Sequence, residues 1–148
     1  MATLIGIARR DAKRAPMQEL QEATVSMASG VNHDSRGRPG DRQVTVLSQG
    51  AWQAALHELG KEVPWITRRA NLLVDDLDLE NSTGSEICIG DLRLLITRET
   101  DPCSRMDDQY DGLTNALKPN WRGGVCCRVI NDGVIRVGDT IRMIPAAN

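Results

Sequence analysis

Apolar residues occur in short runs along this chain, and Gly, Asp and Asn separate most of the runs. Short runs with frequent turn residues between them are typical of a β-meander or a β-barrel. In an alternating stretch, every second side chain lies on the same face of a strand. The pattern predicts strands over Leu4–Arg9, Gln21–Met27, Arg42–Leu47, Asn71–Val74, Ser85–Ile89, Leu92–Arg98, Gly124–Ile130 and Thr140–Ile144.

Three turns that contain glycine predict how some of these strands are joined. Ile89-Gly90-Asp91-Leu92 and Val137-Gly138-Asp139-Thr140 each place Gly where a two-residue hairpin requires a positive φ. We therefore expect a β-hairpin at both places. Asn131-Asp132-Gly133-Val134 carries an Asp-Gly signal of the same class and predicts short antiparallel strands in the last third of the chain.

Two segments have helical rather than strand periodicity. In Ser48–Leu59 the apolar residues recur at helical spacing between a Ser cap and Gly60, which predicts an amphipathic helix. Asp108–Leu117 has apolar residues on one face and is followed by Pro119, so we expect a second helix there. His33–Asp41 contains too many turn formers for regular structure and is predicted to be a polar loop that lines a cleft.

The length of 148 residues suits one domain, over residues 1–148, with one hydrophobic core. No apolar run approaches the roughly 20 residues that span a bilayer, so a membrane protein is not expected. At the N-terminus, Leu4–Ile7 precedes Arg9-Arg10, which is the reverse of the order in a secretory signal. These features predict a cytoplasmic protein.

The charged residues are scattered along the sequence, and the formal net charge is −2. No basic stripe suited to a phosphate backbone is visible, so nucleic acid is not an expected partner. Aromatic residues make up 3% of the chain, which also disfavours a platform for stacking bases. No HExxH, GxSxG, Walker or GxGxxG pattern is present, and the acidic stretch Asp75–Glu80 lacks the spacing of a calcium loop.

The four cysteines lack paired CxxC spacing, which fits neither a disulfide framework nor a structural zinc site. Cys126 and Cys127 are neighbours in a predicted strand, so they point to opposite faces and at least one of them belongs to the core. Cys88 lies in the middle of another predicted strand, where it packs inside or faces solvent. In a reducing compartment all four are expected to be free thiols.

Cys103 is the best placed of the four for chemistry, because it follows Pro102 at the end of a long predicted strand. Arg98 and Arg105 favour its thiolate form, whereas three nearby aspartates oppose it. Taken alone, the local sequence favours a simpler interpretation, in which Cys103 is a small, half-buried residue at the start of a loop.

Two segments place arginine beside small or polar residues at the entry of a strand: Trp65–Asn71 and Asn120–Gly124. Arginine binds phosphate through a bidentate fork, and a glycine pair lets backbone amides approach an oxyanion. The simpler interpretation is that Arg68 and Arg69 form surface ion pairs and that Gly123-Gly124 is a bend.

Taken in order, these segments resemble the MOSC domain, the module at the C-terminus of molybdenum cofactor sulfurases, in the amidoxime-reducing component and in small stand-alone bacterial proteins. The resemblance covers most of the chain. It rests on Gly40–Leu47, Arg69–Leu72, Ile89-Gly90-Asp91 with Pro102-Cys103 after it, Arg122–Val125 and Val137-Gly138-Asp139.

The resemblance implies a mainly β fold, a β-barrel of the pyruvate-kinase-barrel-like type with about two short peripheral helices. It also implies a molybdenum–molybdopterin cofactor, with Cys103 as the catalytic residue and the molybdenum ligand. A soft thiolate suits molybdenum better than a hydroxyl would. The residues that it implies for binding the cofactor are Arg42, Arg69, Asn71, Asp101, Arg122 and Gly123.

Three functions stay open on the sequence. The first is molybdenum-dependent redox chemistry, as an oxidoreductase with a redox partner that supplies electrons. The second is a metal-free sulfur carrier or sulfur transferase, in which Cys103 accepts a persulfide from a cysteine desulfurase. The third is a binding module that has kept the barrel without the chemistry.

Overall fold

The structure is a computed structural model that describes residues 2–101 and 111–146. Its helical segments are α1 (Gln49–Leu59), α3 (Leu113–Leu117) and the 3₁₀ turns η1 (Trp65–Arg68) and η2 (Pro119–Trp121). Its strands are β1 (Ala2–Arg9), β2 (Gln18–Leu20), β3 (Glu22–Ser26), β4 (Gly30–Val31), β5 (Val44–Ser48), β6 (Leu72–Val74), β7 (Glu86–Ile89), β8 (Leu92–Glu99), β9 (Val125–Asn131), β10 (Gly133–Arg136) and β11 (Thr140–Ile144).

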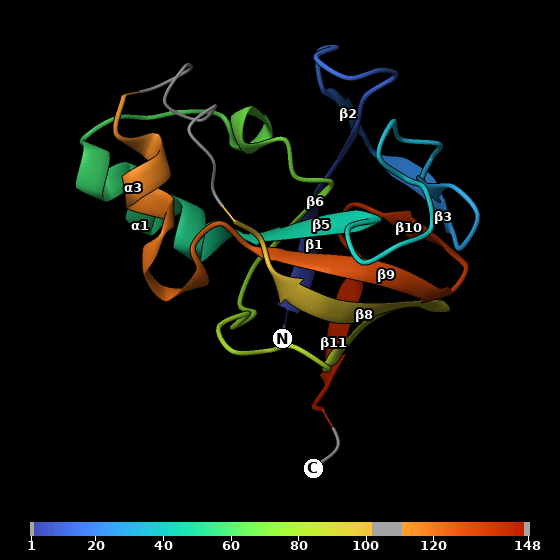
Figure 1. Cartoon of the computed structure of the whole chain (residues 1–148). Coiled ribbons are helices and arrows are strands. Elements are labelled where there is room, and N and C mark those ends of the chain that lie inside the picture. The colour runs from blue at the N-terminus through green and yellow to red at the C-terminus, as the bar shows by residue number, and fades with distance from the viewer. Residues whose placement is uncertain (1, 102–110, 147–148) are drawn as a thin grey trace.

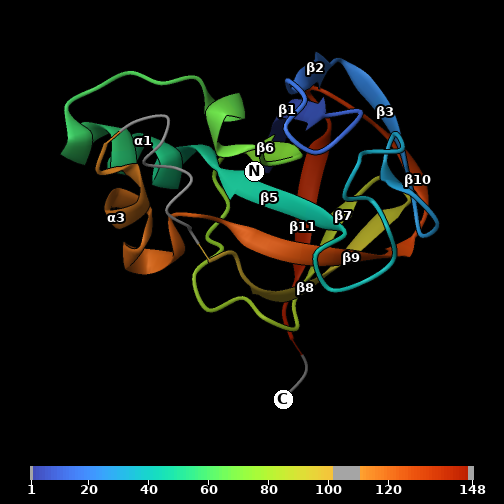
Figure 2. The same cartoon turned by 45° about the horizontal axis from the view of Figure 1, so that its top comes forward.

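Seven strands form a closed barrel in the order β11-β7-β8-β9-β5-β6-β1, and pairing of β1 with β11 closes it (Figure 1). Strand β2 extends the sheet beside β1, and β10, β3 and β4 form a separate small sheet. The helices α1 and α3 pack against each other on one side of the barrel, as Figures 1 and 2 show. The predicted mainly β fold with short peripheral helices is therefore confirmed.

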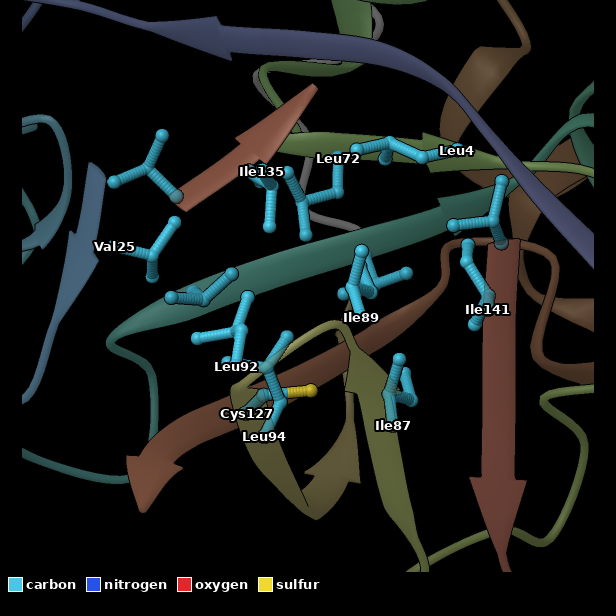
Figure 3. Packing of buried hydrophobic residues seen from close by; sticks show 14 of the residues in the cluster. Leu4, Val25, Leu72, Ile87, Ile89, Leu92, Leu94, Cys127, Ile135 and Ile141 are labelled. Atoms are coloured by element: carbon cyan, nitrogen blue, oxygen red, sulfur yellow. The ribbon is translucent and has the colours of Figure 1, made fainter. Parts of the chain in front are cut away.

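The barrel interior is filled by aliphatic side chains, including Leu4, Leu72 and Ile87, and by the thiol of Cys127 (Figure 3). A second apolar cluster lies outside the barrel, where Leu47 and Leu73 pack with residues of α1 and α3. Strand β6 is thus covered on both faces, which explains its unbroken apolar run Leu72–Val74, and β5 is covered on its outer face at Leu47. Burial on both faces also holds the helical layer firmly on the barrel.

The predicted hairpin at Gly90 is confirmed, because β7 and β8 pair with Ile89 opposite Leu92, and Gly90 has φ +59°. The short antiparallel strands predicted in the last third are present, but the hairpin predicted at Gly138 is wrong. The turn at Gly138 does form, with the Asp139 N–H donating to the Arg136 carbonyl over 3.0 Å, but the strands that it joins belong to different sheets.

Long-range pairing is the reason for this difference. Strand β10 pairs with β3, and β11 pairs with β1 and β7. With these partners, Ile135 of β10 and Ile141 of β11 are both buried in the barrel core. The burial of these apolar side chains favours the long-range pairing over a local hairpin between β10 and β11. A turn signal specifies the bend and leaves the choice of partner strand to burial.

Helix α1 agrees with its prediction, with Ser48 at the N-cap and Gly60 at the C-cap in the left-handed region at φ +67°. The Ser48 side chain makes no capping hydrogen bond, however. Helix α3 is the described part of the second predicted helix, whose first residues lie outside the described residues. Residues 32–43 form an irregular loop, as predicted. No helix in the described ranges is long and apolar enough to cross a bilayer.

Candidate functional site

Arg10 lies where strand β1 leaves the barrel, and it is the most unusual charged residue of this end of the molecule. The residue is only 4% exposed. Its backbone N–H donates to Asp34 Oδ1 over 2.8 Å, and its carbonyl accepts from the Ser35 N–H over 2.9 Å. The backbone of Arg10 is therefore fixed to the loop of residues 32–43.

The surroundings of the Arg10 guanidinium are electropositive. Burial lowers the pKa of Arg10 first, and the neighbouring guanidiniums of Arg36, Arg69 and Arg42 lower it further. Asp34 is the carboxylate that opposes this effect. The guanidinium makes no hydrogen bond with any described residue. A buried cation among like charges costs free energy, and an anionic ligand would relieve that cost.

Asp34 organises this cluster through the backbone rather than through an ion pair with a side chain. Its Oδ1 accepts from the Arg10 N–H, and its Oδ2 accepts from the Arg36 N–H over 3.1 Å. A buried carboxylate that accepts two backbone N–H groups holds its loop rigidly. The arginines at this end are thus placed by the fold before any ligand arrives.

Asn71 joins three strands beside the arginines. Its Oδ1 accepts from the Thr45 N–H over 3.0 Å and from Thr45 Oγ1 over 3.3 Å, and its Nδ2 donates to the Ala8 carbonyl over 3.2 Å. The side chain is 4% exposed, so it ties the start of β6 to β5 and β1. An amide nitrogen carries two hydrogens, and the second has no partner among the described residues.

The structure places the predicted cofactor-binding residues in two groups. Arg42 and Arg69 lie within electrostatic reach of Arg10, and Arg69 has a left-handed φ of +63° at the end of η1. Gly123 is far from Arg69 along the chain but lies beside the neighbouring Arg68 in space, because its carbonyl accepts from Arg68 Nη2 over 3.0 Å. The 3₁₀ turn before β6 is therefore joined to the loop before β9.

Arg122 and Asp101 point elsewhere. Arg122 Nη1 lies 3.2 Å from Glu58 Oε2 and donates to the Ala116 carbonyl over 3.1 Å, so this guanidinium faces the helices. The Asp101 carboxylate is 91% exposed and lies 4.0 Å from Arg98. Their assignment to cofactor binding stays a prediction.

Cys103 lies outside the described residues, but the point from which its segment departs is defined. Thr100 is buried, and its N–H donates to the Gly124 carbonyl over 2.9 Å. Its Oγ1 lies 3.6 Å from the Cys126 sulfur. The chain thus leaves β8 beside the start of β9. Cys126 of β9 is opposite Thr45 of β5 in the register, and Thr45 is the hydrogen-bond partner of Asn71.

The described cysteines are free, buried thiols: Cys88, Cys126 and Cys127. Burial, and then the neighbouring Cys126, raises the pKa of Cys127 far above that of an ordinary thiol. Such a thiol is inert as a nucleophile or a metal ligand. Residues 2–101 and 111–146 also contain no group of three His, Cys, Asp or Glu side chains that could hold a metal ion.

The model of the MOSC domain matches residues 21–142 of the sequence, which is most of its length. The chain belongs to the MOSC domain family. A comparison with curated protein sequences finds no match. The match confirms the resemblance noted in the sequence. The family is associated with binding of the molybdenum cofactor.

Solved structures share the fold of this MOSC domain at low sequence identity. YuaD from Bacillus subtilis is 18% identical, with a TM-score of 0.84 over 99% of this chain and 98% of that chain. YiiM from Geobacillus stearothermophilus is 15% identical, with a TM-score of 0.78 over 97% of this chain and 75% of that chain. YiiM from Escherichia coli is 13% identical, with a TM-score of 0.74 over 99% of this chain and 71% of that chain.

Sequence reasoning missed Arg10 and Asp34 of this MOSC domain. The sequence did contain a signal for Arg10. Arg9 and Arg10 stand together at the end of β1, and because side chains alternate along a strand, only one of two neighbouring arginines can face solvent. Asp34 stood in the loop predicted from turn formers and had no feature that set it apart. Its role depends on backbone hydrogen bonds over 24 positions of sequence, which a local pattern does not contain.

Proposed function

We propose that this MOSC domain binds a molybdenum–molybdopterin cofactor, with Cys103 as the molybdenum ligand and the arginines around Arg10 as the site of the cofactor's phosphate. The observation that carries the proposal is a buried guanidinium without a hydrogen-bond partner in the described residues, surrounded by three more arginines. This donor set fits a phosphate dianion, because arginine offers paired N–H groups to its oxygens.

The neighbouring residues have complementary roles in this proposal. Arg10, Arg42 and Arg69 neutralise the phosphate, and Asp34 keeps the Arg10 backbone in position. The second amide hydrogen of Asn71 is available to a carbonyl or ring nitrogen of the pterin. When bound, the cofactor supplies two-electron redox chemistry at molybdenum. The protein residues bind the cofactor and orient it.

Purification from cells that make the cofactor tests the proposal directly. We expect the wild-type domain to carry molybdenum, measured by elemental analysis, and pterin, measured by fluorescence after oxidation and release. Arg10→Gln should carry less of both, because it removes a guanidinium from the phosphate site. Cys103→Ser should keep the pterin and lose one sulfur ligand in the X-ray absorption spectrum of molybdenum.

Arg128→Gln is the matched control, since Arg128 is an exposed arginine on β9 and should carry the wild-type content. A wild-type domain without metal or pterin, and without uptake on reconstitution, would refute the proposal. If mass spectrometry instead finds one added sulfur atom on Cys103 after incubation with a cysteine desulfurase and cysteine, the persulfide carrier is the correct function. In that case Cys103→Ser must not gain the sulfur.

A further inference from the structure

Cations that are scattered along the sequence gather at one end of the barrel in the structure. We define the basic rim as seven of the 18 Lys and Arg residues: Arg10, Lys13, Arg14, Arg36, Arg38, Arg42 and Arg69. They lie in the connection between β1 and β2, in the loop of residues 32–43 and at the end of η1. Figures 1 and 2 show the first two segments beside each other, and the hydrogen bond from the Ser35 N–H to the Arg10 carbonyl joins them.

The three carboxylates in the β1–β2 connection and the loop of residues 32–43, Asp11, Asp34 and Asp41, are fewer than the seven cations of the rim. Asp11 pairs with Arg9 over 2.8 Å, and Asp34 is used by two backbone N–H groups. Lys13, Arg14 and Arg38 are exposed and form no ion pair with any described residue. The positive charge of Lys13, Arg14 and Arg38 therefore faces solvent.

The opposite end of β1 carries acidic residues. Asp75 Oδ1 accepts from the Thr3 N–H over 2.6 Å, so the acidic stretch Asp75–Glu80 begins beside the start of β1, whereas the rim follows its end. Eight residues of strand separate the two ends, or roughly 25 Å at the rise of a strand. A protein with a net charge of only −2 thus has charges of opposite sign at its two ends, which orients an approaching charged partner.

From this distribution we propose that the basic rim is a docking surface for an acidic protein. A protein partner is favoured over nucleic acid because residues 10–16 and 32–43 contain no Phe, Tyr or Trp on which a base could stack, and Trp65 of η1 is partly buried against Gly6, with its indole N–H donating to Glu19. The acidic opposite end would also repel a long polyanion that extends beyond the rim. A partner with a local cluster of carboxylates matches both features. Arg10, Arg42 and Arg69 belong both to the rim and to the proposed cofactor site, so the inference is tested on Lys13, Arg14 and Arg38, which the cofactor proposal does not use.

The test uses two charge-reversal variants with the same net charge. The rim variant is Lys13→Glu with Arg14→Glu and Arg38→Glu, and the control is Lys61→Glu with Lys118→Glu and Arg128→Glu, at exposed positions outside the rim. The probe is a fluorescent poly-L-glutamate peptide, compared with an oligothymidylate of equal length by fluorescence anisotropy. Circular dichroism checks that both variants fold.

We expect wild-type protein to bind poly-L-glutamate at low salt and to lose affinity as salt rises. The rim variant should bind roughly tenfold or more weakly, and the control should change much less, because charge located at the interface dominates the attraction. Equal losses in the two variants, or no loss in the rim variant, would overturn the docking surface. Tighter binding of the oligothymidylate would overturn the choice of a protein partner.

Discussion

Gln43 and Arg10 are both buried polar side chains at the same end of the barrel, yet their surroundings differ in kind. Gln43 is 1% exposed, and every part of its amide is used. Its Nε2 donates to the carbonyls of Met27 over 2.7 Å and Gly37 over 3.0 Å, and its Oε1 accepts from the Val129 N–H over 3.0 Å. The Arg10 guanidinium has no such partner among the described residues.

This difference distinguishes a polar side chain that is buried for stability from one whose burial indicates a ligand site. A buried polar group with all its hydrogen bonds made contributes to stability and needs no ligand. A buried cation beside like charges is costly, and a fold retains it where a ligand supplies the compensation. Gln43 therefore holds the loop of residues 32–43 to the barrel, and Arg10 has the surroundings expected of the proposed phosphate site.

The largest effect is expected for Gln43→Ala. The substitution leaves an N–H and two carbonyls buried without partners, which should lower the free energy of unfolding by about 3 kcal/mol. Urea denaturation measures the change. Gln49→Ala, at a partly exposed position at the start of α1, is the control and should stay within about 0.5 kcal/mol. A loss as small as that of the control would show that Gln43 does not anchor the loop.

A smaller loss is expected for Asp34→Ala. This substitution removes the acceptor of the Arg10 and Arg36 N–H groups and the carboxylate that opposes the arginine charges, which should cost about 2 kcal/mol. The loss should grow at low salt, because the remaining like charges repel more strongly. Asp41→Ala, which removes an exposed carboxylate of the same loop, is the comparison and should change stability little.

Arg10→Gln should change stability in the opposite direction. Removing a buried cation that has no hydrogen-bond partner in residues 2–101 and 111–146 is expected to raise the free energy of unfolding by about 1 kcal/mol in the absence of phosphate. Phosphate should raise the melting temperature of the wild type and have less effect on the variant, since a ligand that binds only the folded state stabilises it. Equal phosphate effects on both proteins would contradict the assignment of Arg10 to the anion site.

The smallest effect is expected for Arg122→Gln. Its contacts with Glu58 and the Ala116 carbonyl lie on the helical side, and a partly exposed ion pair contributes about 0.5 kcal/mol or less. The phosphate response should equal that of the wild type. If Arg122→Gln instead loses pterin in the purification experiment, Arg122 has the binding role that the sequence predicted, and the site extends toward α1.

Much of the local structure was predictable. The spacing of apolar residues predicted the seven barrel strands, because alternation is dictated by the geometry of a single strand. The helix that ends at Leu59 was equally clear, because Gly60 takes the left-handed conformation that the cap requires. The short strands β2, β4 and β10 were missed, because two to four residues contain too little periodicity to detect.

The candidate site was predictable only in pieces. Arg42 and Arg69 were named from the family resemblance, and the structure places both near Arg10. Arg122 was named in the same way, and its guanidinium faces α1. Which direction a side chain takes depends on neighbours that are distant in sequence, such as Glu58, and no local motif records them.

The sequence by itself determined the seven barrel strands, the family and the turn positions, because each depends on residues close together in the chain or on their order along it. The tertiary structure alone decided that β10 pairs with β3, that β1 closes the barrel with β11, and that Arg10 is surrounded by Arg36, Arg42 and Arg69. These are contacts between distant segments, and their selection follows from burying one shared core. The charge of the site is thus a property of the closed barrel.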